Sequence, residues 1–413
     1  MCATPSATSV SNRIPELKWP LIACLYLTQG IPFGLAMEAL PSLLRHQGAD
    51  LAALSWLPLV SLPWVVKFCW APVVDNHWCQ RLGRRRSWIL TMQSIIALIL
   101  VVTMMLNLQQ GSLGWLIALS ALASLASATQ DIATDALVAE QFQPNHLSSA
   151  NAIQVAGAMI GFFYGGSLFL VAYTQFGETA ALCLVLLPVI VSLGLMAYWR
   201  EPEPFPEPRP KKQQASLLQF LISGKHAWAL MAAAFLSAAT VVGGHGLSRL
   251  MLVDAGWQLD QIGLVGMIGG AITITLGCGA GAWLVARLGP WRAFFLGIVC
   301  SGLATSVWAY LALGRSPVSL TAVWPATTLA SFGAGCTSVA VMTAAMHYTH
   351  ARHQAGTDMT IVQSSRDLGE MAASSSLIAL SAALGYAGGF AIGIVLTILT
   401  LAMIPILLRS RSN

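Results

Sequence analysis

The sequence predicts an all-α polytopic membrane protein whose twelve transmembrane helices form two pseudo-symmetric six-helix bundles. Of its 413 residues, 56% are hydrophobic and only 9% are charged, whereas soluble domains average about 25% charged residues. Apolar segments of about 20 residues, the length that crosses a bilayer, recur along the whole chain. This composition excludes an ordinary cytosolic enzyme, a disordered protein and a nucleic-acid-binding protein.

The apolar segments form two groups of six, separated by a polar gap. We expect them at residues 19–44, 51–74, 87–108, 113–140, 148–173 and 179–199, and again at 226–250, 260–286, 291–313, 319–346, 358–383 and 385–408. Five of the nine residues from Pro202 to Pro210 are proline, which favours an extended linker. The predicted domains are a cytoplasmic tail (1–18), a first bundle (19–199), a Pro-rich cytoplasmic linker (200–225), a second bundle (226–408) and a cytoplasmic tail (409–413).

Lysine and arginine predict the topology. With a cytoplasmic N-terminus, sixteen of the 21 basic residues lie on the cytoplasmic side, and only Arg45, Arg249 and Arg315 lie at or near the outer face. Cytoplasmic loops of membrane proteins carry such an excess of positive charge. We therefore expect both termini in the cytoplasm. The two remaining basic residues, Lys67 and Arg366, fall inside predicted spans.

The two bundles resemble repeats of one another. Three pairs of features match at nearly constant separation: the loops at 81–86 and 287–292 (206 residues), Gly48 and Gly256 (208 residues), and Gln154 and Gln363 (209 residues). Parallel six-helix repeats joined by a linker are typical of secondary transporters.

Segment four contains two acids, Asp131 and Asp135, one helical turn apart on one face. A carboxylate in the bilayer core costs roughly 2.5–3.5 kcal/mol, so this face should point into the bundle. Two acids on one face also favour retention of a proton by one of them. We expect a functional role for Asp131. For Asp135 and Glu140 we favour structural pairing with the arginines of the loop before segment three.

Segment eleven is the most polar span. Gln363, Arg366, Asp367 and Glu370 follow each other at helical spacing and share one face. We expect Arg366 to pair with Asp367 or Glu370, and the stripe to line a wet site for substrate or a coupling ion. With the 209-residue offset, the matching positions of segment five are uncharged, so duplication does not explain these charges. The alternative is a salt-bridged packing seam.

Five further polar residues are candidates for substrate binding or ion coupling: Gln29, Glu38, Lys67, Gln154 and His245. Glu38 can face an interior cavity and bind a proton, or extend to the membrane interface. His245 lies one turn before Arg249, which can simply reach the outer interface, and a lone histidine near a helix end is more often structural.

The loop after segment two combines Asp75 with the run Gly83-Arg84-Arg85-Arg86. It resembles the cytoplasmic gate motif of the major facilitator superfamily, although the spacing from Asp75 to Gly83 is longer than in the common form. This resemblance implies the fold of that superfamily, and gating contacts made by these residues together with Asp135 and Glu140. The alternative is a basic loop that only sets topology.

The longer form of the motif is similar to the AmpG-like branch of the superfamily. The resemblance rests on three stretches: Lys67-Phe-Cys-Trp-Ala-Pro before Asp75, Gly83-Arg-Arg-Arg-Ser-Trp after it, and Gln130-Asp-Ile-Ala-Thr-Asp-Ala in segment four. Within this branch, the compact twelve-helix length most resembles the RhtX/FptX siderophore permeases. That resemblance implies import of a ferric siderophore, such as ferric pyochelin, across the bacterial inner membrane, downstream of an outer-membrane receptor. The alternative is a muropeptide or another organic solute.

No catalytic motif, paired Cys/His cluster or phosphate-binding P-loop is present. We therefore expect a transporter rather than an enzyme, with no metal site and no cofactor; iron would enter only as part of the transported chelate. A sensor that does not transport is a further alternative, but it gives no reason for duplicated halves. Without a nucleotide site, a proton gradient is the simplest energy source, with Asp131 and Glu370 as proton carriers.

Overall fold

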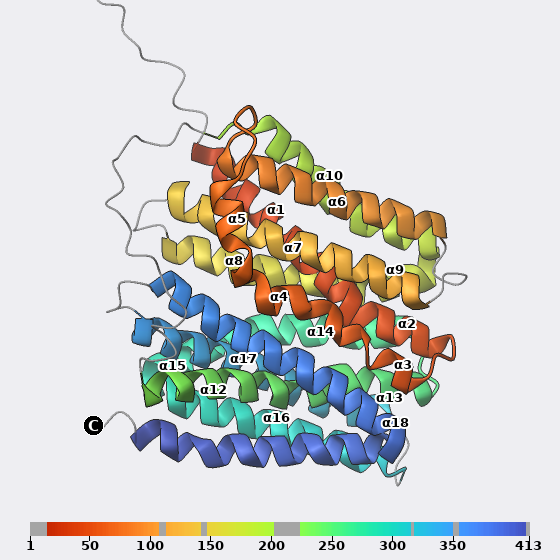
Figure 1. Ribbon diagram of the computed structural model, residues 1–413. Coiled ribbons are helices and arrows are strands. Elements are labelled where there is room, and N and C mark those ends of the chain that lie inside the picture. The colour runs from red at the N-terminus through yellow and green to blue at the C-terminus, as the bar shows by residue number, and fades with distance from the viewer. Residues whose placement is uncertain are drawn as a thin grey trace, which may run out of the picture.

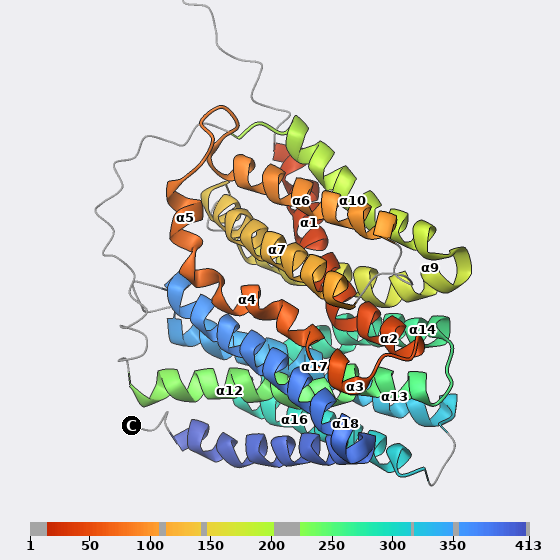
Figure 2. The ribbon, with the colours of Figure 1, turned by 45° about the vertical axis from the view of Figure 1, so that its right-hand side comes forward.

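The computed structural model describes residues 15–106, 113–141, 147–201, 224–314, 318–349 and 355–409, and the regular structure in these ranges is helical (Figure 1). Eleven helical stretches are long and apolar enough to cross a membrane. The last, Asp358–Ile404, is interrupted at Gly385, whose φ of 73° no helix adopts. The chain turns back there (Figure 2), so this stretch forms two spans and the predicted twelve-helix fold is confirmed.

The first bundle contains spans 1 to 6. Their elements are α1 (Pro15–Gly34), η1 (Leu35–Ala39) and α2 (Leu40–His46) in span 1; α3 (Leu51–Leu54), η2 (Leu57–Ser61), α4 (Leu62–Val66), η3 (Lys67–Cys69) and α5 (Ala71–Asn76) in span 2; α6 (Arg84–Leu106) in span 3; α7 (Leu113–Gln141) in span 4; α8 (Leu147–Phe163), η5 (Tyr164–Leu168) and α9 (Phe169–Phe176) in span 5; and α10 (Glu178–Tyr198) in span 6.

The second bundle contains spans 7 to 12. Their elements are α12 (Lys225–Val242), η6 (Gly243–Leu247) and α13 (Ser248–Asp254) in span 7; α14 (Leu259–Ile272), η7 (Thr273–Ala280) and α15 (Gly281–Leu288) in span 8; α16 (Pro290–Ala312) in span 9; α17 (Leu320–Thr349) in span 10; and α18 (Ala355–Arg409), which provides spans 11 and 12 on either side of Gly385.

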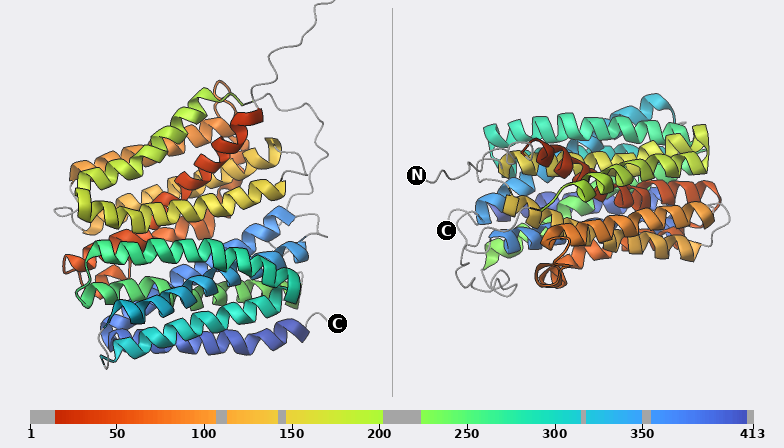
Figure 3. Two further views of the ribbon diagram at one scale, coloured as in Figure 1. Left: turned by 180° about the vertical axis from the view of Figure 1, so that it is seen from behind. Right: turned by 90° about the horizontal axis from the view of Figure 1, so that it is seen from above.

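The two bundles lie side by side with their helices roughly aligned (Figures 1 and 3). We call the end at which α1 begins, α10 ends and α12 begins the linker end, and the opposite end, with α2, α3 and α13, the far end. Most of the predicted linker, residues 202–223, and parts of both tails lie outside the described residues. The bundles contact each other through spans 1, 2 and 5 of the first and spans 7, 8 and 11 of the second.

Backbone geometry supports the duplication and fixes its offset at 208 residues. Gly48 and Gly256 both have left-handed φ angles, 91° and 84°, at the ends of spans 1 and 7. The one-residue turns at Gly177 and Gly385, with φ of 82° and 73°, are also 208 apart, and such turns favour glycine. The pairing of Gln154 with Gln363 is therefore one residue out of register. The corrected counterparts of the charges in span 11 are Ala158, Met159 and Phe162, which are again uncharged.

Spans 1 and 5 pack with their backbones in contact. A Cβ atom at Gly161 would collide with the carbonyl oxygen of Leu27, and one at Gly34 would collide with that of Phe162. Small residues four apart allow such close approach of membrane helices. The second bundle repeats the contact 208 residues later, where Gly369 lies against the carbonyl oxygen of Phe235.

Span 2 differs from the single helix expected at 51–74. Short α-helical and 3₁₀ pieces follow one another, and Pro58, Pro63 and Pro72 each lie in the first turn of a piece. Proline removes one backbone donor and clashes with the preceding turn, so each begins a new piece. The irregular path places Lys67 at the start of the turn η3.

Candidate functional site

An ion pair between spans 2 and 4 forms the polar centre of the first bundle. Nζ of Lys67 lies 2.5 Å from Oδ2 of Asp131, and both side chains are buried. The indole ring of Trp64 lies beside the ammonium group, with 5.1 Å between Nζ and the ring centroid. Because an unpaired buried charge is strongly destabilising, each partner requires the other in this conformation.

Asp135, one turn further along span 4, accepts two hydrogen bonds from uncharged donors. The hydroxyl of Tyr26 in span 1 and Nε2 of Gln154 in span 5 each lie 2.9 Å from its Oδ1. Within the described part of the chain, the expected pairing of Asp135 with the loop arginines is not formed, because these two neighbours occupy its carboxylate instead. The side chain of Glu140 lies outside the described residues.

The second bundle approaches this centre through span 11. Asp367 lies within electrostatic range of both Lys67 and Asp131. Gln363, Arg366 and Glu370 accompany Asp367 on the same helix, and all four side chains are partly exposed. The contact brings charges from spans 2, 4 and 11 together across the boundary between the two bundles.

Arg366 departs from its expected role. No carboxylate of the described residues lies within ion-pair distance of its guanidinium group, so the expected bond to Asp367 or Glu370 is absent. The guanidinium group is electrostatically close both to Asp367 and to Cys278 of span 8. Arg366 is therefore a partly exposed cation at the boundary of the bundles without a direct ion pair among the described residues, and a substrate or coupling role for the stripe on span 11 remains a prediction.

A second ion pair joins the bundles toward the far end. A guanidinium nitrogen of Arg249 in α13 lies 2.6 Å from Oε1 of Glu38 in η1, and the hydroxyl of Ser167 in η5 donates to the same oxygen. Glu38 is only 2% exposed. It does not extend to the interface, and neither does Arg249. His245 contacts its own helix, with 3.4 Å between Nδ1 and the carbonyl oxygen of Val241.

A third polar contact lies at the far end itself. Arg45 of α2 donates two hydrogen bonds of 2.7 Å to the two carboxylate oxygens of Asp254 in α13. The hydroxyl of Tyr386 donates to Oδ2 of Asp254 at 2.6 Å. The far end is therefore closed by two ion pairs that connect the bundles.

The arginine-rich loop before span 3 connects two helix ends of the first bundle. Glu201, just after span 6, accepts hydrogen bonds from the backbone N–H groups of Arg85 and Arg86 at 2.9 and 3.1 Å. The side chain of Arg86 donates in return to the carbonyl oxygens of Met196 and Ala197. Gly83 leaves room for Glu201, since a Cβ there would lie 2.5 Å from its Oε2. A gating role for the loop remains a prediction; the side chain of Asp75 lies outside the described residues.

Replacing Glu201 by alanine should lower the thermal stability of the purified protein. Two N–H groups at the start of α6 would lose their acceptor, and loss of an N-terminal helix cap costs about 0.5–2 kcal/mol. Thermal unfolding in detergent measures the effect. Asp50→Ala is the matched control, because Asp50 precedes α3 without a side-chain capping bond. Equal melting temperatures for the two variants would contradict a capping role.

Several polar contacts of the site region escape sequence reasoning. Nε2 of Gln93 donates to Ser192 at 2.6 Å, and Nε2 of Gln130 donates to the carbonyl oxygen of Leu25 at 3.2 Å. Both amides also reach the hydroxyl of Thr28. Nε2 of Gln29 is buried and has no hydrogen-bond partner among the described residues. A single polar residue in an apolar helix produces no repeating sequence pattern. Only the three-dimensional structure therefore shows that these residues lie close together.

Comparison with known families decides the identity of the fold. The family model for the Major Facilitator Superfamily matches residues 22–374, most of the chain. The chain belongs to the major facilitator superfamily. Solved structures agree with the assignment: a bacterial homolog of the human lysosomal transporter Spinster superposes with a TM-score of 0.71 at 14% identity and covers 96% of each chain. The nucleoside transporter NupG superposes with a TM-score of 0.68 at 10% identity.

Curated sequences place this superfamily member near AmpG-type proteins. The putative transporter AmpG 4 of Rickettsia conorii is 26% identical over 336 residues, which cover 78% of this chain and 80% of the relative. The anhydromuropeptide permease of Escherichia coli K12 is 25% identical over 292 residues, covering 69% of this chain and 59% of that protein. The chain is thus a membrane transporter of the major facilitator type with AmpG-like relatives.

Proposed function

We propose that the protein imports an anhydromuropeptide-type solute, a sugar linked to a short acidic peptide, from periplasm to cytoplasm, and that a proton gradient drives this import. The observation that carries the substrate class is the similarity to the anhydromuropeptide permease of Escherichia coli. The ferric-siderophore reading has no such support among the similar proteins, whose names point to the muropeptide alternative.

The charges at the bundle boundary support an anionic solute. Inside the described spans, Lys67 and Arg249 have carboxylate partners, whereas no carboxylate of a described residue lies within 4 Å of Arg366. A guanidinium group binds a carboxylate in a bidentate fork. We infer that Arg366 binds a peptide carboxylate of the solute, and that the partly exposed Gln363 adds an uncharged contact.

The same cluster supports coupling to protons. Lys67 forms an ion pair with Asp131 of the first bundle and lies within electrostatic range of Asp367 in the second. We propose that protonation of Asp131 releases Lys67 toward Asp367, so that the protonation state and the contact between the bundles change together. Glu370 is a second candidate carrier, since no cation of the described residues forms an ion pair with it.

Separate uptake assays with the two candidate solutes distinguish the two substrate classes. Cells that lack the gene should not accumulate radiolabelled anhydromuropeptide in the cytoplasm. Reintroducing the gene should restore this accumulation. Uptake of radio-iron as a ferric siderophore should be equal in the two strains. Loss of siderophore uptake with normal muropeptide uptake would overturn the proposed substrate.

We further propose that the protein lies in the bacterial inner membrane with both termini in the cytoplasm. The support is the excess of basic residues on one side of the predicted spans. Reporter fusions after Gln109 and after Gln213 should report the periplasmic and the cytoplasmic side, respectively. Two fusions on the same side would contradict this topology.

A further inference from the structure

The ion pair between Glu38 and Arg249 has a geometry that a purely structural contact does not require. Both donors, Arg249 and Ser167, bind the same carboxylate oxygen, Oε1. The other oxygen, Oε2, is buried and has no hydrogen-bond partner among the residues that the structure describes. A buried carboxylate oxygen without a donor is unfavourable, and this unoccupied oxygen is a free position for a proton.

The pair crosses the boundary between the bundles where their backbones are tightly packed. Glu38 belongs to η1 of the first bundle, and Arg249 is the second residue of α13, which follows η6 in the second bundle. A Cβ at Gly266 of span 8 would collide with the hydroxyl of Ser167 and lie 2.8 Å from Oε1 of Glu38. A Cβ at Gly166 would lie 2.6 Å from the carboxyl carbon of Glu38. The two glycines therefore allow the helices to pack closely around the carboxylate of Glu38.

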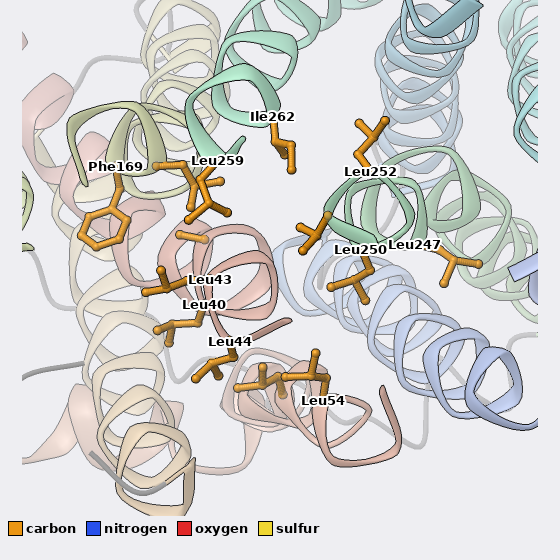
Figure 4. Packing of buried hydrophobic residues seen from close by; sticks show 14 of the residues in the cluster. Leu40, Leu43, Leu44, Leu54, Phe169, Leu247, Leu250, Leu252, Leu259 and Ile262 are labelled. Carbon is orange, nitrogen blue, oxygen red and sulfur yellow. The ribbon is translucent and has the colours of Figure 1, made fainter. Parts of the chain in front are cut away.

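Apolar side chains from both bundles complete the closure between this pair and the far end. One buried apolar cluster includes Leu40, Leu43 and Leu44 of α2 and Phe169 of α9 in the first bundle, together with Leu250, Leu252, Leu259 and Ile262 in the second (Figure 4). All of these side chains are buried. The layer keeps water from Glu38 while the far end is closed, so the charge state of Glu38 is coupled to whether the bundles touch here.

The structure assigns to Glu38 the role of a proton-binding residue that opens the far end: a proton added to Oε2 removes the negative charge that holds Arg249 at Oε1, and the loss of this ion pair releases the two bundles from each other. Neutral Glu38 leaves the Arg249 cation buried without a counter-charge, which strongly disfavours the closed arrangement. Closure requires Glu38 to release the proton and bind Arg249 again. This role rests on the proposed proton-coupled import and places a further proton site outside the central cluster, toward the far end.

Other charged and titratable groups on the elements packed around η1 do not replace Arg249 as the partner of Glu38. Toward the far end those groups are His245 one turn before Arg249, the pair Arg45 and Asp254, His46 at the end of α2, Asp260 at the start of α14, and Tyr164 and Tyr173 in span 5. Toward the linker end, α1 adds Lys18, Cys24 and Tyr26. Tyr164 donates its hydroxyl to the carbonyl oxygen of Leu184 at 3.0 Å. Among the described residues, only Arg249 forms an ion pair with Glu38.

A distance measurement without any solute tests this role independently of the substrate. Spin labels at Phe176→Cys and Leu313→Cys, two exposed positions in different bundles, report far-end separation of the full-length protein in nanodiscs, in a background without native cysteines. The parent should be closed at pH 7.5 and should populate a longer distance at pH 5. Glu38→Gln should show the longer distance at both pH values, with an open-to-closed ratio raised on the order of a hundredfold at pH 7.5.

Two further variants distinguish proton binding by Glu38 from a general weakening of the contact between the bundles at the far end. Asp254→Asn breaks the outer ion pair and should retain the pH response. Ser167→Ala removes a donor to the charged carboxylate, so opening should begin at higher pH. A closed Glu38→Gln protein, or one that still responds to pH like the parent, would overturn the assignment. If Glu38→Gln does not fold, an unchanged opening midpoint in Ser167→Ala overturns it equally. Failed muropeptide transport with an intact pH response would reject only the proposed substrate.

Discussion

Replacing Asp131 by asparagine should abolish accumulation of solute driven by a pH gradient, with a loss of at least about tenfold. The amide keeps the shape of the side chain but cannot carry a proton. It also leaves Lys67 buried without its counter-charge, and removal of one partner of a buried ion pair destabilises by about 3–5 kcal/mol. Uptake into vesicles with an imposed gradient, together with thermal unfolding, measures both effects.

A double variant separates the two causes. Lys67→Gln combined with Asp131→Asn removes both buried charges, so thermal stability should recover while gradient-driven accumulation stays lost. Glu370→Gln should lose accumulation without loss of stability, because Glu370 forms no ion pair with any residue in the described part of the chain. Asp50→Asn, at an exposed position before α3, is the control and should behave as the parent. Normal accumulation by Asp131→Asn and Glu370→Gln would show that these residues are structural.

Replacing Gly161 by valine should prevent correct folding. The new side chain would overlap the backbone carbonyl of Leu27 in span 1, and backbone cannot move aside as a flexible side chain can. We expect a destabilisation of at least about 3 kcal/mol, since overpacking alone costs 1–3 kcal/mol. Size-exclusion profiles and melting temperatures in detergent report the loss.

The second bundle supplies an internal repeat of this experiment. Gly369→Val should have the same effect, because Gly369 meets the carbonyl oxygen of Phe235 in the matching place. Gly194→Ala is the control: no heavy atom lies within 4 Å of the added Cβ, and alanine favours helix by up to about 1 kcal/mol over glycine. A monodisperse Gly161→Val protein that melts with the parent would contradict the close packing of spans 1 and 5.

Hydropathy and charge predict the spans and their duplication, because both properties can be evaluated from neighbouring residues in the sequence. They do not predict partners across the bundle. Glu38 and Arg249 are separated by 211 positions in the sequence, and nothing local indicates that they meet. The broken course of span 2 was also missed: its three prolines are visible, but apolar length alone suggests one continuous helix.

The central acids illustrate the same limit. Helical spacing places Asp131 and Asp135 on one face, yet only the fold gives Asp131 the ammonium group of Lys67 and Asp135 the uncharged donors Tyr26 and Gln154. Similarly, the stripe on span 11 suggests internal pairing, whereas the side chain of Arg366 finds no carboxylate within ion-pair distance among the described residues. Composition identifies candidate charges, and three-dimensional packing decides which of them are paired.

The measurement that tests the central claim most directly is uptake of radiolabelled anhydromuropeptide by the purified protein in proteoliposomes with an acidic exterior. We predict accumulation above the external concentration, abolished by a protonophore and absent with Asp131→Asn. Simple equilibration that ignores the protonophore, or no uptake by protein that melts cooperatively, would contradict proton-coupled muropeptide import.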